Sequence, residues 1–343
     1  HSLVNQYQFL RIKRQSLNKT TRNQSFDQVA GICIIFMIFT HICQLSYQTG
    51  WPVYMKSLGI FYFYMYFFFM KSGMFFHEKS IKDCIRNNAR HLLMPYFLYM
   101  LIGHIVHCIS IYVKEGVLPL SSIFIQPWYE IYSWGSSIGN LPLWFLLCLF
   151  FVKISYNILV KLHVNSIVIL LISFAGAVYL QFSDMIIGDY QVPYTIGAFL
   201  MAMSVYSFAF LLRKLTDMGG QIWTYILGAI FLISIYIGSP GVDIRSNNCS
   251  SFCLPWFLFS FLACMFLLRL FAIKPFAMAW LGNVGRNSMT YYVWHWILLD
   301  LVSILYNILG GESNKILWGL MVLCCIVFLP LIQHIKTKIT CKN

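Results

Sequence analysis

Seven ionisable side chains interrupt the apolar stretches of this sequence, and they are its first candidates for chemistry. They are His41, Lys71, His104, His107, Lys153, His295 and Asp300. Such groups are costly inside a membrane-spanning helix, so each one marks a functional site unless a neighbouring helix satisfies it. Imidazole is the general base best suited to neutral pH, and a carboxylate can orient it. We therefore predict His41, His295 and Asp300 as catalytic residues.

The depth of these groups along their helices places them in one layer. At 1.5 Å per residue, His41 and His104 lie about 18 Å from the cytoplasmic ends of their helices. Asp300 lies at about 20 Å and His295 at about 12 Å. Either a polar cavity gathers them, or each histidine bonds to an adjacent helix. His104 and His107 share a helix face, but no third ligand is clear, so no metal site is predicted.

The composition indicates that lipid is the solvent that these helices need. Of the 343 residues 59% are apolar and only 10% are charged, and the mean hydropathy is +0.71. Soluble domains carry about a quarter charged residues. The expected fold is an all-α polytopic membrane protein with about ten transmembrane helices. The ten windows are 29–48, 58–77, 92–113, 141–162, 165–183, 194–213, 220–239, 252–273, 287–309 and 316–335.

The basic residues fix the orientation of these helices. With the N-terminus inside, eighteen Lys and Arg residues fall in inner segments and only four in outer loops. This asymmetry predicts that the N- and C-termini are both cytoplasmic. The net charge of +13 is spread over short clusters between apolar runs, so no nucleic-acid partner is expected. We predict a basic arm over 1–28, one membrane domain over 29–335 and a short basic tail over 336–343.

The cysteines and the N-terminal residues say little about chemistry. Eleven cysteines are scattered without CxxC pairs, and most are expected to be buried thiols. Cys249 and Cys253 flank an outer loop and could pair in an oxidising compartment. Residues 1–28 lack the apolar stretch of a cleaved signal peptide.

A second group of polar residues lies near the cytoplasmic ends of the helices. Lys71 either extends its charge to the lipid headgroups or faces an inner vestibule, where it would bind a phosphate-bearing ligand. Arg86 and Arg90 lie at the entrance of the next helix, where they either anchor it or add to that site.

Five short stretches resemble the bacterial membrane acyltransferases of the acyltransferase 3 class. In chain order they are Phe26–Gly31 continuing to His41, Phe67–Gly73, Arg90–Tyr96, Leu143–Leu146, and Gly285–Ser288 followed by Tyr292 and His295. Each stretch is weakly specific alone. Their order and the ten-helix topology together are fairly specific, and they cover most of the chain to about residue 296.

The resemblance implies an activity and roles for particular residues. Members of the class commonly transfer acetyl from acetyl-CoA to hydroxyls of carbohydrates, which implies the bacterial inner membrane as location. His41 would be the essential histidine, as base or acyl relay, and Arg90 would help to hold the donor. The class usually has Arg or Lys eleven residues before that histidine, where this chain has Ala30. Lys71, at a similar depth on the next helix, is a candidate for the missing charge.

We therefore predict an O-acetyltransferase that takes acetyl from cytoplasmic acetyl-CoA, without a metal. The acceptor would be a surface carbohydrate or a lipid-linked sugar, and membrane lipid would surround the protein. Lys71, Arg86, Arg90, Ser72 and Asn287 would bind the donor. The alternatives are a transporter or flippase for such a substrate, or a member of the class impaired by Ala30. The sequence leaves open the acceptor sugar, the acyl chain and the oligomeric state.

Overall fold

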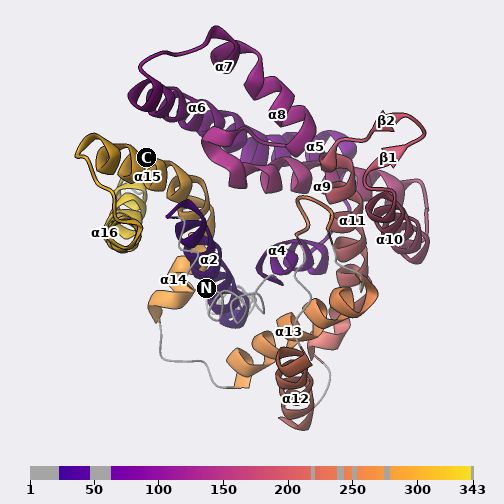
Figure 1. The fold of residues 1–343 in the computed structure, drawn as a ribbon. Coiled ribbons are helices and arrows are strands. Elements are labelled where there is room, and N and C mark those ends of the chain that lie inside the picture. The colour runs from indigo at the N-terminus through magenta and orange to yellow at the C-terminus, as the bar shows by residue number, and fades with distance from the viewer. Residues whose placement is uncertain are drawn as a thin grey trace, which may run out of the picture.

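The computed structural model describes residues 23–46, 63–217, 221–237, 243–248, 253–273 and 279–340, and these form a bundle of helices (Figure 1). The first half of the chain contains α2 (Gln24–Leu45), α4 (Phe63–Met74), α5 (Ile81–Asn88), the π-helical turn η2 (Ala89–Leu93), α6 (Met94–Glu115), α7 (Leu120–Phe124), α8 (Gln126–Trp134), the 3₁₀ segment η3 (Ile138–Leu143) and α9 (Trp144–Lys161). The second half contains α10 (Ser166–Phe182), a small hairpin of β1 (Ile186–Ile187) and β2 (Tyr190–Gln191), α11 (Tyr194–Leu212), η4 (Arg213–Asp217), α12 (Gln221–Ile237), α13 (Cys253–Ile273), α14 (Ala279–Arg286), α15 (Ser288–Ile308) and α16 (Asn314–Thr340).

Short polar signals start and stop helices that are otherwise uniformly apolar. The side chains of Asn23 and Asn165 each accept a hydrogen bond from the backbone N–H two residues on, at 3.0 and 2.9 Å, and so cap α2 and α10. Gly116 and Gly135 adopt positive φ directly after α6 and α8 and end them. These caps separate apolar runs that hydropathy alone would leave continuous.

The structure confirms a polytopic helical protein at the coarse level. Among the described residues, six helical stretches are long and apolar enough to cross a membrane: Gln24–Leu45, Ile81–Glu115, Gln126–Lys161, Tyr194–Leu215, Cys253–Ile273 and Asn314–Ile339. Ser166–Phe182 and Ile222–Phe231 are apolar but shorter. The ten crossings and the cytoplasmic termini stay predictions, and so does the division into arm, domain and tail, because residues 1–22 and 341–343 lie outside the described ranges.

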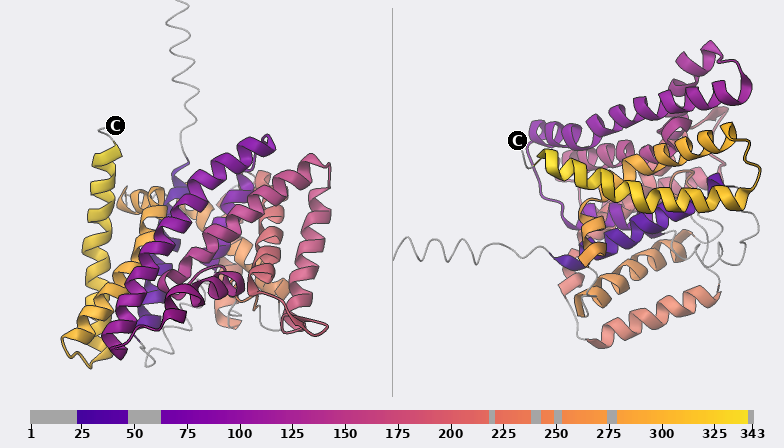
Figure 2. Two further views of the ribbon diagram at one scale, coloured as in Figure 1. Left: turned by 90° about the horizontal axis from the view of Figure 1, so that it is seen from above. Right: turned by 90° about the vertical axis from the view of Figure 1, so that its left-hand side faces the viewer.

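The helices lie side by side, and both views of Figure 2 place the start of α2 at the same end of the bundle as the end of α16. An even number of crossings requires this geometry. Large apolar side chains such as Leu101, Leu171 and Ile326 are exposed on the outside of the bundle, as lipid contact requires. The buried core gathers instead around α2, which contacts α4, α13, α14 and α15.

One very close helix contact joins α14 to the start of α2. A Cβ atom at Gly285 would overlap the backbone carbonyl oxygen of Asp27, so only glycine permits this approach. Gly285 begins the Gly-Arg-Asn-Ser stretch described above, and its role there is packing.

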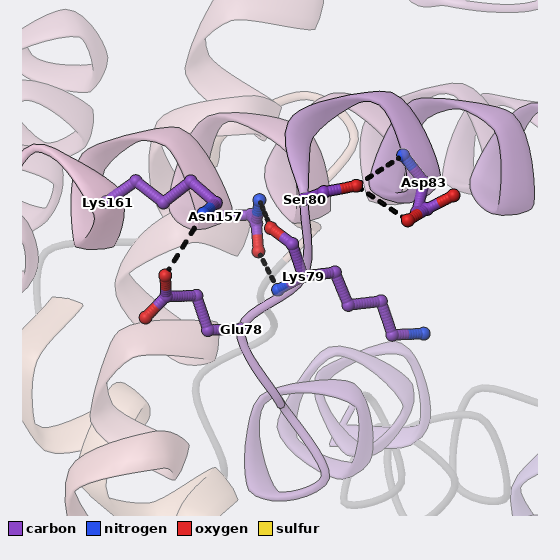
Figure 3. Close-up of polar contacts among 6 residues, drawn as sticks. All are labelled: Glu78, Lys79, Ser80, Asp83, Asn157 and Lys161. Atoms are coloured by element: carbon purple, nitrogen blue, oxygen red, sulfur yellow. Dashed lines mark hydrogen bonds and ion pairs between the residues drawn. The ribbon is translucent and has the colours of Figure 1, made fainter.

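The segment between α4 and α5 is fastened to α9, as Figure 3 shows. The Asn157 side chain donates to the Lys79 carbonyl at 3.0 Å and accepts from the Lys79 backbone N–H at 2.9 Å. Next to it, Lys161 pairs with Glu78 at 3.2 Å. The side chain of Ser80 then caps α5. These contacts fix the end of α4, which carries Lys71.

Candidate functional site

Two helices that are distant in sequence bring a pair of histidines into contact. His41 on α2 and His295 on α15 lie with ring nitrogens Nδ1 and Nε2 2.9 Å apart. Their rings are nearly parallel, at 9° and with centroids 5.2 Å apart. The edge of Trp296 contacts His41 from another side, at 5.2 Å between centroids. His295 is fully buried. The structure therefore places both predicted histidines in one site.

Backbone carbonyls determine which nitrogens of this pair carry protons. Nδ1 of His295 lies 2.7 Å from the carbonyl oxygen of Tyr292 and 3.2 Å from that of Tyr291. Carbonyls only accept, so Nδ1 of neutral His295 carries the hydrogen and its Nε2 accepts from Nδ1 of His41. Nε2 of His41 is then the unprotonated nitrogen, available as a base or nucleophile.

His41 lines a cavity of about 360 Å³, here called the histidine pocket. Its polar and aromatic lining includes Thr40, Gln44, Trp144, Tyr292, Asp243 and Arg245. The last two come from the loop between α12 and α13. Burial lowers the pKa of the Arg245 guanidinium, and the Asp243 carboxylate partly offsets the shift. A guanidinium group keeps its proton in proteins, so Arg245 remains charged.

A second cavity of about 330 Å³, the lysine pocket, lies toward the end of the bundle at which α2 begins. Lys71, Ser72, Lys153 and Ser288 line it, together with aromatic and aliphatic side chains. Lys71 also lies 3.9 Å from the buried carboxylate of Asp27. Within the described ranges Lys153 has no ion-pair partner. The pocket thus presents two ammonium groups, only one of which is close to an acid.

Tyr292 separates the two pockets and lines both of them. Its hydroxyl donates to the carbonyl oxygen of Pro142, which lines the histidine pocket. Its ring lies against Phe145, which lines the lysine pocket, with centroids 5.8 Å apart. A ligand in either cavity would therefore reach the same side chain.

The structure places the other predicted residues away from these pockets. Asp300 follows His295 by five residues, which turns it about 140° around α15, and it lines neither cavity. Arg86 is exposed and paired with Asp83 at 2.9 Å. Arg90 is exposed in η2. Asn287 donates to the side chain of Asn283 at 3.1 Å.

The second histidine group also lies elsewhere. Nε2 of His104 donates to the carbonyl oxygen of Ile123 at 3.0 Å. The His104 side chain lines a separate apolar cavity between α6, α7 and α8. No group of three or more His, Cys, Asp or Glu residues in the described part of the chain could hold a metal ion. Cys249 lies outside the described residues, so its pairing with Cys253 stays a prediction.

Sequence reasoning missed two residues of the histidine pocket and left one of the lysine pocket without a role. Arg245 and Asp243 carry no motif, and Arg245 counted only as an outer-loop charge. Lys153 stood out as an ionisable residue within an apolar run, which is the one signal that pointed to it.

One comparison with known proteins bears on this site. The family model of an acyltransferase domain matches residues 23–333, a range that contains both histidines and both pockets. No curated protein and no solved structure matches the chain significantly. The family match covers far more than half of the sequence and agrees with the helical architecture. The chain belongs to the acyltransferase 3 family of membrane acyltransferases.

Proposed function

We propose that this acyltransferase moves an acyl group, in the first instance acetyl, from acyl-CoA to a hydroxyl of a carbohydrate or lipid-linked sugar. The observation that carries the proposal is the His41–His295 pair, because His41 lines a pocket that shares Tyr292 with a second pocket of different chemistry. The lysine pocket contains cations, and the histidine pocket contains a base beside polar and aromatic groups that suit a sugar. Tyr292 lines both pockets, so their ligands would meet next to it.

The lysine pocket is the proposed donor site. Lys71 and Lys153 suit the phosphate groups of coenzyme A, and the serines beside them can hydrogen-bond to its pantetheine arm. Arg86 and Arg90 lie exposed on the neighbouring α5–η2 segment and would attract the anionic donor from the surface. Asn287 lies directly before Ser288 and would help to shape the entrance.

Ala30 fits this assignment of Lys71. It is fully buried on α2, and helical spacing places it on one face with Asp27 and Ile34. Asp27 lies next to the Lys71 ammonium, and Ile34 lines the lysine pocket. The charge that the family usually carries at position 30 would therefore point to the region that Lys71 occupies. We propose that Lys71 supplies that charge, so that Ala30 does not abolish activity.

The chemical step needs one base and a positioned thioester. Nε2 of His41 takes the proton of the acceptor hydroxyl while that oxygen attacks the thioester carbonyl carbon. A C–O bond forms, the C–S bond breaks, and the proton passes from His41 to the departing thiolate. His295 keeps His41 in the required tautomer through the 2.9 Å hydrogen bond.

The same proposal sets the topology. Ten crossings with both termini in the cytoplasm place the lysine pocket on the cytoplasmic side, where acyl-CoA is found, and the histidine pocket beyond it. The basic residues of the inner segments support this orientation. The expected location is the bacterial inner membrane.

A transfer assay on membranes tests the proposal. Labelled acetyl-CoA is added to inverted vesicles that contain the full chain and a panel of neutral and acidic polysaccharides. We expect label in one acceptor class, its loss in His41→Ala and its retention in His334→Ala, an exposed histidine on α16. Folded protein is checked by gel filtration in detergent.

The outcome separates the proposed enzyme from the rival transporter. Acceptor movement across the membrane without acylation would decide for transport. Full activity of His41→Ala would refute the assignment of the base. An inactive wild type with every acyl-CoA tried would refute the proposed function.

A further inference from the structure

Among the described residues that line the histidine pocket, Arg245 is the one with a permanent positive charge. Its guanidinium makes no hydrogen bond or ion pair with a described residue, and its Nε atom is buried. Its one aromatic contact in the described structure is with Trp134, with the guanidinium carbon 5.4 Å from the ring centroid. Arg245 is half-buried, and its buried Nε–H donor without a partner is costly unless a ligand accepts from it. This cost points to a ligand group inside the pocket.

The loop that carries Arg245 is fixed on the bundle. Asp243 and Asn248 exchange two backbone hydrogen bonds at 2.9 and 3.0 Å, which close the loop. The buried side chain of Asn247 donates to the carbonyl of Ala177 on α10 at 2.8 Å. Arg245 is therefore held beside His41 before any ligand binds, which lowers the entropic cost of binding.

The charges around Arg245 decide what kind of ligand fits. The Asp243 carboxylate lines the same pocket, accepts from the Arg245 backbone N–H at 3.0 Å and stays within electrostatic range of the guanidinium, as does Glu130. The Asp243 carboxylate thus lies in the pocket with Arg245, and Glu130 outside its lining adds a second negative charge within electrostatic range. An anionic acceptor would be repelled, whereas the hydroxyls of a neutral sugar can accept from a guanidinium and donate to a carboxylate.

The aromatic side chains of the pocket fit the same ligand. Tyr64, Trp144 and Trp296 line it, and aromatic rings pack well against the apolar faces of sugar rings. Its volume of about 360 Å³ leaves room for one or two sugar units at His41.

We propose that Arg245 and Asp243 form the acceptor subsite of the histidine pocket, and that it takes an uncharged sugar. The guanidinium holds a hydroxyl or ring oxygen next to the hydroxyl that faces His41, and the carboxylate accepts from a neighbouring hydroxyl. This inference rests on the proposed acyl transfer for its catalytic meaning, but the sugar binding can be measured without turnover.

The test uses the purified full chain in detergent and two readouts. Binding of neutral trisaccharides of glucose, galactose and N-acetylglucosamine, and of trigalacturonic acid, is followed by tryptophan fluorescence, since Trp144 and Trp296 line the pocket. Transfer from labelled acetyl-CoA to the same sugars gives KM for donor and acceptor. The variants are Arg245→Met, Arg245→Lys and Asp243→Asn, and Lys315→Met serves as an exposed outer cation control.

We expect a neutral trisaccharide to bind and the acidic one to bind at least tenfold more weakly. Arg245→Met should raise the acceptor Kd and KM about tenfold or more and leave the donor KM unchanged, and Arg245→Lys should restore part of the loss. Asp243→Asn removes a negative charge from the pocket, so the Kd for trigalacturonic acid should move closer to the Kd for the neutral trisaccharide. Lys315→Met should match the wild type.

Three results would overturn the inference: no neutral trisaccharide binds, trigalacturonic acid binds best, or Arg245→Met alters the donor KM alone. Failure of the proposed function would look different, because sugar binding would then depend on Arg245 while no acyl group was transferred.

Discussion

His41 and His295 share a 2.9 Å hydrogen bond between ring nitrogens, although 254 residues separate them in the chain. His295 has no route to solvent, and its other nitrogen donates to the carbonyl of Tyr292. In the proposed mechanism, His295 orients the base His41, and the backbone fixes the tautomer of His295. In many hydrolases a carboxylate orients the catalytic histidine in the same way.

The first prediction concerns His295 as a positioning residue. His295→Phe keeps a ring of similar size but removes the acceptor for Nδ1–H of His41, so the base loses its fixed tautomer. We expect kcat to fall by about 10²- to 10³-fold, in the range of general-base effects. The donor KM should not change. Steady-state transfer kinetics measure the split between the two constants.

A structural role for His295 would give another pattern. Global loss of packing would lower the thermal unfolding midpoint and alter both KM and kcat. Trp294→Phe, at a partly buried aromatic position of the same helix, is the matched control and should keep kcat within about twofold.

The second prediction concerns the two lysines of the lysine pocket, the proposed donor site. Lys153→Met and Lys71→Met should each raise the KM for acetyl-CoA about tenfold, since each removes one ammonium that faces the donor phosphates. Lys153 has no acid partner within the described residues, so its loss should not lower thermal stability. Lys338→Met, at an exposed lysine on α16, is the control and should keep the wild-type KM.

An unchanged donor KM in both lysine variants would contradict the donor site. A basic residue in place of Ala30 adds a second measurement. Combined with Lys71→Met, Ala30→Lys should partly restore the donor KM, because position 30 projects to the same region. Full activity of Lys71→Met with no effect of the second change would remove the link between the two positions.

The third prediction concerns the attachment of α4 to α9 in Figure 3. Asn157→Ala leaves the N–H and C=O of Lys79 without their partner, which costs about 1–3 kcal/mol. We expect a lower unfolding midpoint in differential scanning measurements in detergent. Lys79→Met is the matched control, because Asn157 contacts only the backbone of that residue. Equal unfolding midpoints of Asn157→Ala and Lys79→Met would show that the hydrogen bonds of Asn157 do not stabilise the protein.

The sequence predicted a polytopic helical protein, and it singled out both histidines that the structure brings into contact. Apolar windows locate helices because each crossing needs a minimum length of apolar chain. Depth along a helix, however, is only one coordinate of a side chain. Asp300 and His104 do not line the histidine pocket, because rotation about the helix axis depends on packing that hydropathy does not encode. His41 and His295 share both depth and direction.

Arg245 could not be predicted from any local pattern. It lies in a loop, and its approach to His41 depends on how α10, α11 and α13 pack below that loop. Lys153 could be noticed in the sequence as a charge in an apolar run. That it lines the same pocket as Lys71 follows only from the packing of α4 against α9. Functional residues from loops and from different helices are therefore the part of the site that only the folded structure defines.

The last prediction tests whether the loop of Arg245 must be held in place. A Cβ atom at Gly197 on α11 would lie 2.7 Å from Cβ of Asn247 and 2.9 Å from its Cγ and Nδ2 atoms. Gly197→Ala should therefore push Asn247 off its hydrogen bond to Ala177 and displace the loop without touching any pocket residue. We expect the acceptor KM to rise, as in Arg245→Met, while the donor KM stays constant.

Gly319→Ala is the control for this change, because a Cβ atom there meets no other atom within 4 Å. That variant lies within α16 and should be neutral or slightly more stable, since alanine favours helix. Gly197→Ala combined with Asn247→Gly removes the three clashing atoms but also the hydrogen bond, and should leave the acceptor KM high. Recovery of the wild-type KM in the double variant would show that the clash alone mattered, and that the Asn247 hydrogen bond does not position Arg245.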